Sequence, residues 1–261
     1  MGSIEAVLSL DLEENDFLYR IRRGSRIVYV SVLHEDIIPH GCRTDGSRVL
    51  SNLRRVPKWE EHWKTLTVRK GSHGVNSTPD EFTPHALNLK ALNIHLPKFF
   101  NILDLIPVSR ISDRISRVRF EDETWILKIA RFKHEIPALQ REISIYSTLA
   151  LLNFPLAPKF VGFAYEEVKD RTIGFLMEDI SGRTPNIEDL EDCKKTVRLL
   201  HLFGIIHGDL NKYNFLMTES GAKVFDFEVS TAQEDADPAA ADDEMRALAD
   251  KFRDESGIGK R

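Results

Sequence analysis

Polar residues interrupt an apolar stretch late in the chain, GIIHGDLNKYNFLM (residues 204–217). Asp209 and Asn214 lie five residues apart there, and Asp226 follows twelve residues later in VFDFE. A carboxylate can orient or deprotonate a substrate hydroxyl, and an amide oxygen with a second carboxylate can hold magnesium. The spacing therefore favours a site for a metal-bound nucleotide, with Asp209 facing the acceptor and Asn214 and Asp226 as metal ligands.

Strands and helices must position these residues, and the pattern of apolar residues from residue 95 onward predicts a mixture of both. The segments ISRVRF (115–120) and TWILKIA (124–130) read as strands that face each other across an acidic turn. Apolar residues at helical spacing predict helices over 134–152, 186–204 and 240–256. Further strands are expected over 158–167, 171–180 and 223–230. The predicted fold class is α+β.

The first 94 residues are predicted to form a β-rich extension. Residues 16–32 read as a β-hairpin, and 63–68 as another strand. Residues 69–85 are rich in Gly, Ser, Thr, Asn and Pro, which predicts a flexible loop. The expected organisation is therefore an extension over 1–94, a strand-rich part over 95–180 and a short helical part over 181–261.

The composition limits the partners and the compartment. The net charge is −5 with both signs mixed along the chain, so no nucleic-acid partner is expected. No apolar run approaches the ~18 residues of a membrane helix, so no membrane partner is expected either. Two cysteines, Cys42 and Cys193, form no CxxC motif and fit a reducing compartment. We expect a soluble cytoplasmic protein, with a nuclear location left open.

The motifs HGDLNKYN and DFE together resemble the catalytic and metal-binding loops of the protein-kinase-like superfamily. The HGD form is similar to aminoglycoside phosphotransferases and RIO-type atypical kinases, and the DFE form to choline and ethanolamine kinases. Residues from about 95 to 261 resemble fungal kinase-like proteins that carry both motifs and a terminal DESG. The resemblance implies a bilobal fold with a reduced C-terminal lobe, and ATP and Mg as cofactors.

The resemblance also implies a lysine that binds the nucleotide phosphates, and Lys128 in TWILKIA matches it. A buried ammonium needs a partner, because burying an unpaired charge is costly. Glu142, on the following helix, is the preferred partner and is counted with Lys128 among the catalytic candidates. Glu135 is the competitor, although a carboxylate just before Pro137 would more simply serve the helix N-terminus.

A hinge strand should meet adenine through its backbone, and IGFLMEDISG matches it. The candidate adenine contacts are Glu178, Asp179 and Ile180. The phosphate-covering loop departs from the pattern, because residues 103–123 contain no glycine. Ser112 and Ser116 are the candidate phosphate contacts in its place, with Arg110 and Arg114 nearby.

Two interpretations are open for Lys212 and for His207. Lys212 could neutralise the transferring phosphoryl group or be a solvated loop charge. His207 could be catalytic, but it is expected to support the Asp209 loop through hydrogen bonds. The implied activity is ATP- and Mg-dependent phosphotransfer to a hydroxyl of a protein or a small molecule. The alternative is a nucleotide-binding pseudokinase that serves as a scaffold, which the missing glycines and the short C-terminal lobe favour.

Overall fold

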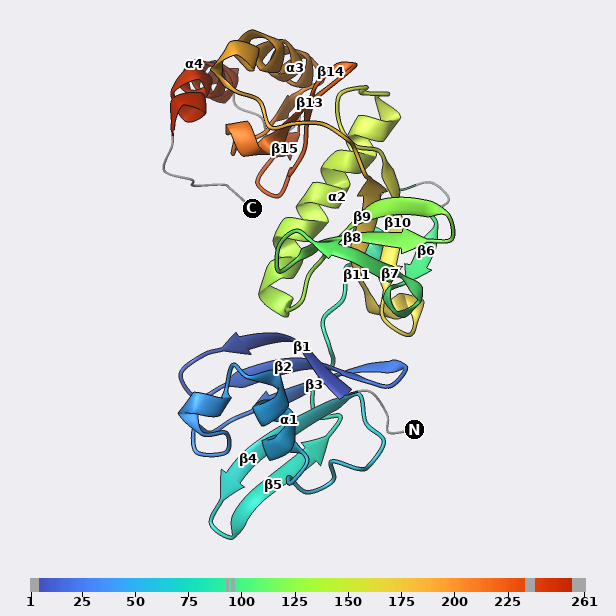
Figure 1. Ribbon diagram of the computed structural model, residues 1–261, viewed down its shortest axis with the longest axis vertical. Coiled ribbons are helices and arrows are strands. Elements are labelled where there is room, and N and C mark those ends of the chain that lie inside the picture. The colour runs from blue at the N-terminus through green and yellow to red at the C-terminus, as the bar shows by residue number, and fades with distance from the viewer. Residues whose placement is uncertain (1–4, 93, 95–96, 233–237, 255–261) are drawn as a thin grey trace. The chain divides into compact units, whose positions relative to one another are not determined.

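The computed structural model describes residues 5–92, 94, 97–232 and 238–254 (Figure 1). The chain divides into two compact units. The first contains residues 1–86 with the short segments 131–133 and 166–171, and the second contains the remainder. Among the described residues, no helix combines the length and the apolar character that a membrane span requires.

The first unit is built on a five-stranded sheet with the strand order β1-β2-β3-β4-β5. The pairs are antiparallel except β3–β4, which is parallel. The elements are β1 (Glu5–Leu12), β2 (Phe17–Arg23), β3 (Arg26–Val32), α1 (Gly46–Leu53), β4 (Thr65–Gly71) and β5 (Gly74–Pro79). The predicted hairpin over 16–32 is confirmed as β2–β3, with Phe17 opposite Val32.

The loop expected over residues 69–85 is wrong for its first half. Residues 69–71 continue β4, and residues 74–79 form the edge strand β5. Asp80 closes this hairpin, because its carboxylate accepts the backbone N–H groups of Lys64 at 2.7 Å and Thr65 at 3.1 Å. The polar composition that predicted a loop instead belongs to an edge strand with one face in solvent.

A buried ion cluster lies in the core of the first unit. Glu166 is 1% exposed. Its Oε1 accepts a hydrogen bond from Arg20 Nε at 2.6 Å, and its Oε2 accepts one from Arg171 at 2.5 Å and one from the Tyr29 hydroxyl at 3.2 Å. Burial, followed by the charge of Glu166, raises the pKa of Tyr29. The carboxylate is therefore paired on both oxygens, as a buried charge must be.

The second unit begins with a six-stranded sheet in the order β6-β10-β11-β9-β8-β7. Its elements are β6 (Phe99–Asn101), β7 (Ile106–Arg110), β8 (Ile115–Phe120), β9 (Glu123–Ile129), α2 (Ile136–Leu151), β10 (Phe160–Tyr165) and β11 (Thr172–Glu178). The predicted pairing of ISRVRF with TWILKIA is confirmed as the antiparallel β8–β9 pair. Helix α2 lies along the sheet (Figure 1), and its buried Leu139, Ile143 and Tyr146 share a core with Phe163 and Phe175.

The remainder of the second unit carries two helices and two small sheets. Its elements are α3 (Leu190–Leu202), β12 (Ile205–Ile206), β13 (Phe215–Thr218), β14 (Gly221–Val224), β15 (Thr231–Ala232) and α4 (Pro238–Arg253). The strand expected over 223–230 ends at Val224, because Asp226 adopts a left-handed φ of 73° that no strand accommodates. The helix predicted over 240–256 is α4, which begins two residues earlier, at Pro238, whereas residues 234–237 and the terminal ESG lie outside the described residues.

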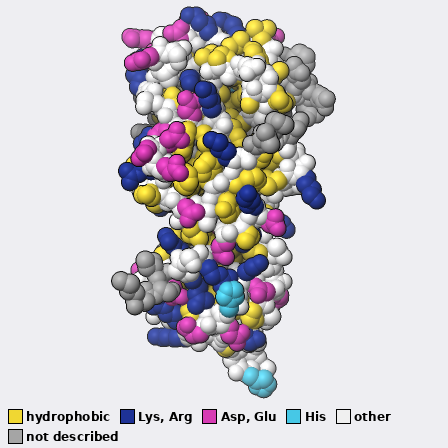
Figure 2. Space-filling model, turned by 90° about the vertical axis from the view of Figure 1, so that its right-hand side faces the viewer, with side chains coloured by type: hydrophobic (Ala, Val, Ile, Leu, Met, Phe, Trp, Pro, Cys, Tyr) yellow, Lys and Arg dark blue, Asp and Glu magenta, His cyan; other side chains and the backbone are white. Residues whose placement is uncertain are grey.

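The described residues thus form a mixed α+β structure with several sheets and four α-helices, which is consistent with a kinase-like fold. Basic and acidic side chains are interspersed over the face drawn in Figure 2. This distribution agrees with the mixed charge of the sequence.

Candidate active site

Lys128 lies at the centre of the site. Strand β9 runs between β11 and β8, so Lys128 belongs to an interior strand and is only 2% exposed. Its Nζ lies 2.6 Å from Oε2 of Glu142, 2.7 Å from Oδ1 of Asp226 and 3.1 Å from Oε1 of Glu228. The structure therefore pairs Lys128 with Glu142 and brings Asp226 to the same point.

Glu142 reaches Lys128 because of its position on α2. It lies three residues after Leu139 and four before Tyr146, so all three share the buried face of the helix. The side chain is fully buried, and its Oε1 also accepts the backbone N–H of Phe227 at 3.3 Å. Glu142 thus binds both the lysine and the backbone of the DFE segment. The competitor Glu135 instead lies 3.6 Å from the guanidinium of Arg114.

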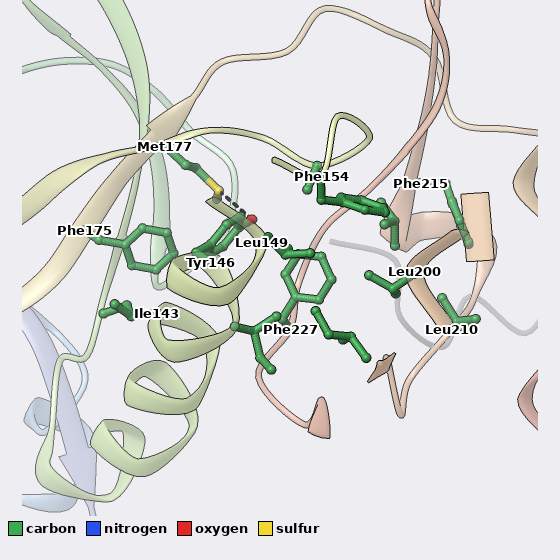
Figure 3. Close-up of a cluster of buried hydrophobic side chains, with 14 of the residues drawn as sticks. Ile143, Tyr146, Leu149, Phe154, Phe175, Met177, Leu200, Leu210, Phe215 and Phe227 are labelled. Carbon is green, nitrogen blue, oxygen red and sulfur yellow. Dashed lines mark hydrogen bonds between the residues drawn. The ribbon is translucent and has the colours of Figure 1, made fainter. Parts of the chain in front are cut away.

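The DFE segment is anchored by its central phenylalanine. Phe227 is fully buried, and its ring lies 5.3 Å from the ring of Tyr146 in an edge-to-face arrangement. Figure 3 shows Phe227 and Phe175 on either side of Tyr146, whose hydroxyl contacts the Met177 sulfur at 3.4 Å. This packing holds the left-handed conformation of Asp226, which costs an L-residue about 1–2 kcal/mol.

His207 links the Asp209 loop to the DFE segment. Its Nδ1 accepts the backbone N–H of Asp209 at 3.3 Å, so Nε2 carries the proton and donates to the Phe225 carbonyl at 3.0 Å. Asn214 completes the loop, because its amide nitrogen donates to the Asp209 carbonyl at 2.8 Å. The amide oxygen of Asn214 consequently faces away from this carbonyl. The supporting hydrogen bonds expected of His207 are confirmed.

Glu244 on α4 is a residue of this loop that sequence reasoning missed. Its carboxylate accepts the backbone N–H groups of Gly208 at 2.7 Å and His207 at 3.3 Å, and it contacts His201 Nε2 at 2.7 Å. Burial raises the pKa of Glu244, but the hydrogen bonds from His201 and Gly208 outweigh it, and the net pKa is lowered. No sequence signal marked this residue, because its partners lie more than thirty positions away.

Gly208 is required by the geometry of the loop. Its φ of 83° lies in the left-handed region, and a Cβ at this position would approach the Val229 carbonyl oxygen to 2.8 Å. A side chain here would therefore be strained in both respects.

An apolar cleft of about 350 Å³ lies beside this cluster, within the size range of ligand pockets. The three hinge candidates Glu178, Asp179 and Ile180 all line it. Its other walls include Ile115, Ile126, Met177, Leu216 and Phe225. Arg117 of β8 donates two hydrogen bonds to Asp179 at 2.6 and 3.0 Å, which brings a charged pair to a mostly apolar surface.

Comparison with known families adds one finding. Residues 169–249 match the RIO domain. This family belongs to the protein-kinase-like superfamily, so the segment with HGDLNKYN and DFE is similar to a kinase-like family. The match covers less than a third of the chain and excludes Lys128 and Glu142. No curated protein matches the sequence.

The RIO-matching segment contains Asp209, Asn214 and Asp226, and the fold brings Lys128 and Glu142 to it from outside. Carboxylate oxygens of Glu142, Asp226 and Glu228 lie within 4.8 Å of one another, so this cluster has donors suited to a hard cation. Glu228, the third residue of DFE, was not among the predicted site residues.

Three of the predicted site residues contact other parts of the structure and not the cluster of Lys128, Glu142 and Asp226. The ammonium of Lys212 donates to the Asp254 carbonyl at 2.7 Å, just after α4. Ser116 lies between Ile115 and Arg117 on β8, so it points to the face opposite the cleft that they line. The hydroxyl of Ser112 accepts the backbone N–H of Arg114 at 3.4 Å and is not among the described cleft residues.

Proposed function

We propose that this protein is an ATP- and Mg-dependent phosphotransferase that moves the γ-phosphoryl group of ATP to a hydroxyl acceptor. The observation that carries the proposal is the ion cluster of Lys128, Glu142 and Asp226, formed from three separate segments next to the apolar cleft. Burying a lysine and two carboxylates costs desolvation free energy. Such a charged cluster beside a pocket is typical of a functional site, and an ammonium there is suited to binding phosphate.

In this proposal the adenine lies in the cleft against the backbone of residues 178–180. The apolar side chains of Ile115, Ile126 and Met177 suit the faces of a flat base. Lys128 then binds the phosphates, with Glu142 fixing its position. The match of residues 169–249 to a kinase-like family supports this arrangement.

The donor set fits a magnesium ion, because Asn214 and Asp226 offer amide and carboxylate oxygens and Mg²⁺ prefers oxygen ligands. When bound, the ion would neutralise charge on the β- and γ-phosphates. Asp226 would hold it with an oxygen of its carboxylate, and Asn214 with the amide oxygen that faces away from Asp209.

Asp209 is the proposed catalytic base. Its carboxylate is exposed, whereas its backbone is fixed by His207 and Asn214. It orients the acceptor hydroxyl and takes its proton as the bond from the acceptor oxygen to the γ-phosphorus forms and the bond to the β-γ bridging oxygen breaks. The acceptor is a protein hydroxyl or a small molecule.

A thermal-shift measurement with ATP, with and without Mg²⁺, tests the nucleotide site. Binding to the native state raises the melting temperature with ligand concentration. We expect a shift with ATP that increases when Mg²⁺ is added. The absence of a shift under both conditions would contradict the proposal.

A second candidate function is a pseudokinase that serves as an interaction scaffold. Two observations favour it: residues 103–123 contain no glycine, and three carboxylates surround the Lys128 ammonium. Incubation with labelled ATP and pools of protein and metabolite acceptors separates the two functions. Label transfer supports the enzyme, whereas nucleotide binding without transfer supports the scaffold.

A further inference from the structure

Glu228 is shared between two cations of the second unit. Its Oε1 lies 3.1 Å from Lys128 Nζ and 2.9 Å from an Arg114 nitrogen, and its Oε2 accepts a hydrogen bond from Arg114 at 3.3 Å. Arg114 lies just before β8, and its Nε donates to the Ile129 carbonyl at 3.1 Å, next to Lys128 on β9. The two cations are therefore held side by side with one carboxylate between them.

Three carboxylates compete for the Lys128 ammonium. Its Nζ donates a hydrogen bond to Oδ1 of Asp226, whereas Oε2 of Glu142 and Oε1 of Glu228 lie 2.6 and 3.1 Å away as ion-pair partners without a hydrogen bond of their own. A phosphate oxygen carries the same sign of charge, so any carboxylate that stays beside the ammonium opposes its binding to Lys128.

Glu228 is the carboxylate best suited to leave. Glu142 is fully buried and fixed by the backbone N–H of Phe227. Asp226 is the proposed metal ligand. Glu228 is partly exposed and already contacts a second cation, so it can release Lys128 without becoming unpaired. Its backbone carbonyl accepts a hydrogen bond from Arg141 at 2.8 Å, so only its side chain needs to move.

We infer that Glu228 is a positioning residue that occupies the phosphate place on Lys128 in the nucleotide-free protein and moves fully to Arg114 when a triphosphate binds. The inference rests on the proposed function, and it assigns the third residue of DFE a role in setting nucleotide affinity. Arg114, which lies in the glycine-free turn between β7 and β8, is the cation that pairs with the Glu228 carboxylate after it leaves Lys128.

Calorimetric titration of the full chain with ATP in the absence of divalent metal tests the inference. Glu228→Gln removes the charge that competes with phosphate while keeping the shape of the side chain. We expect it to bind ATP about tenfold more tightly than the wild type, because a negative charge no longer competes with the phosphates for Lys128. Glu191→Gln, an equal charge change on the exposed face of α3, is the matched control and should bind like the wild type.

Arg114→Ala provides a second test in the same ATP titration. Without Arg114, Glu228 remains on Lys128, so ATP affinity should fall about tenfold. The double variant Arg114→Ala, Glu228→Gln should recover the affinity of Glu228→Gln alone, which loss of a merely structural contact would not produce.

Unchanged or weaker ATP binding by Glu228→Gln overturns the inference, and so does a double variant that remains as weak as Arg114→Ala. Parallel titration of the wild type with MgATP reports on the proposed function separately. If the wild type binds MgATP and Glu228→Gln binds ATP no more tightly than the wild type, only the inference fails. If neither nucleotide form binds any of the proteins, the proposed function fails and the inference with it.

Discussion

The ammonium nitrogen of Lys128 lies 2.7 Å from Oδ1 of Asp226, although the two residues are 98 positions apart in the chain. Lys128 comes from an interior strand, and Asp226 comes from a turn held in a left-handed conformation by the buried Phe227. Their contact joins the RIO-matching segment to a strand that precedes it. The site therefore forms only when the six-stranded sheet that carries Lys128 packs against the later segment that carries Asp226.

Lys128→Met should destabilise the protein strongly. The substitution leaves the carboxylates of Glu142, Asp226 and Glu228 close together without their shared cation. Removing one partner of a buried ion pair typically costs about 3–5 kcal/mol. Urea denaturation of the full chain would measure the loss, with Lys195→Met on the exposed face of α3 as the control. Equal midpoints for the two variants would show that the cluster contributes little to folding.

Asp209→Asn should abolish phosphoryl transfer while leaving nucleotide binding intact. The amide keeps the shape of the side chain but cannot take the proton of the acceptor hydroxyl, and general-base catalysis contributes about 10²–10⁴-fold. Turnover of labelled ATP and calorimetric titration with MgATP would be measured on the same preparation. Turnover at the wild-type rate would remove Asp209 from the proposed role.

Glu244→Gln should loosen the Asp209 loop. The neutral amide is a weaker acceptor for the N–H groups of His207 and Gly208, and loss of such charge-assisted bonds costs about 1–3 kcal/mol. We expect a lower free energy of unfolding at neutral pH, measured by urea denaturation.

The same pair of proteins gives a pH test. The pKa of Glu244 is lowered in the folded state, so its contribution is fully present above the ordinary glutamate pKa and is lost as the pH falls through the folded value. The stability difference between the wild type and Glu244→Gln should therefore narrow in acid. A difference that stays constant or widens below pH ~4 would contradict this assignment.

Glu166→Gln should destabilise the first unit. Glu166 is paired with Arg20, Arg171 and Tyr29, and neutralising it leaves the buried guanidinium of Arg20 and the partly buried one of Arg171 without their counter-charge. We expect a loss of about 3–5 kcal/mol by urea denaturation of the full chain. Glu14→Gln, in the exposed turn between β1 and β2, provides the comparison and should unfold like the wild type.

Local patterns in the sequence predicted much of the second unit. Alternation and an acidic turn indicated the β8–β9 pair, and helical spacing indicated α2. Glu142 could be chosen over Glu135 because its neighbours Leu139 and Tyr146 marked the buried face of the helix. These predictions were accurate because the backbone geometry of strands and helices repeats every few residues and leaves its period in the sequence.

Other features were decided only by the tertiary structure. β5 was hidden in a polar segment because an edge strand needs few apolar residues, and Asp80 closes it through hydrogen bonds to residues fifteen and sixteen positions away. The contacts of Glu244 with the Asp209 loop and of Glu228 with Arg114 join residues up to 114 positions apart. The sequence by itself determined which chemical groups are present and which elements carry them. Only the folded chain decided which of those groups meet, because such contacts depend on how distant segments pack and not on any local period.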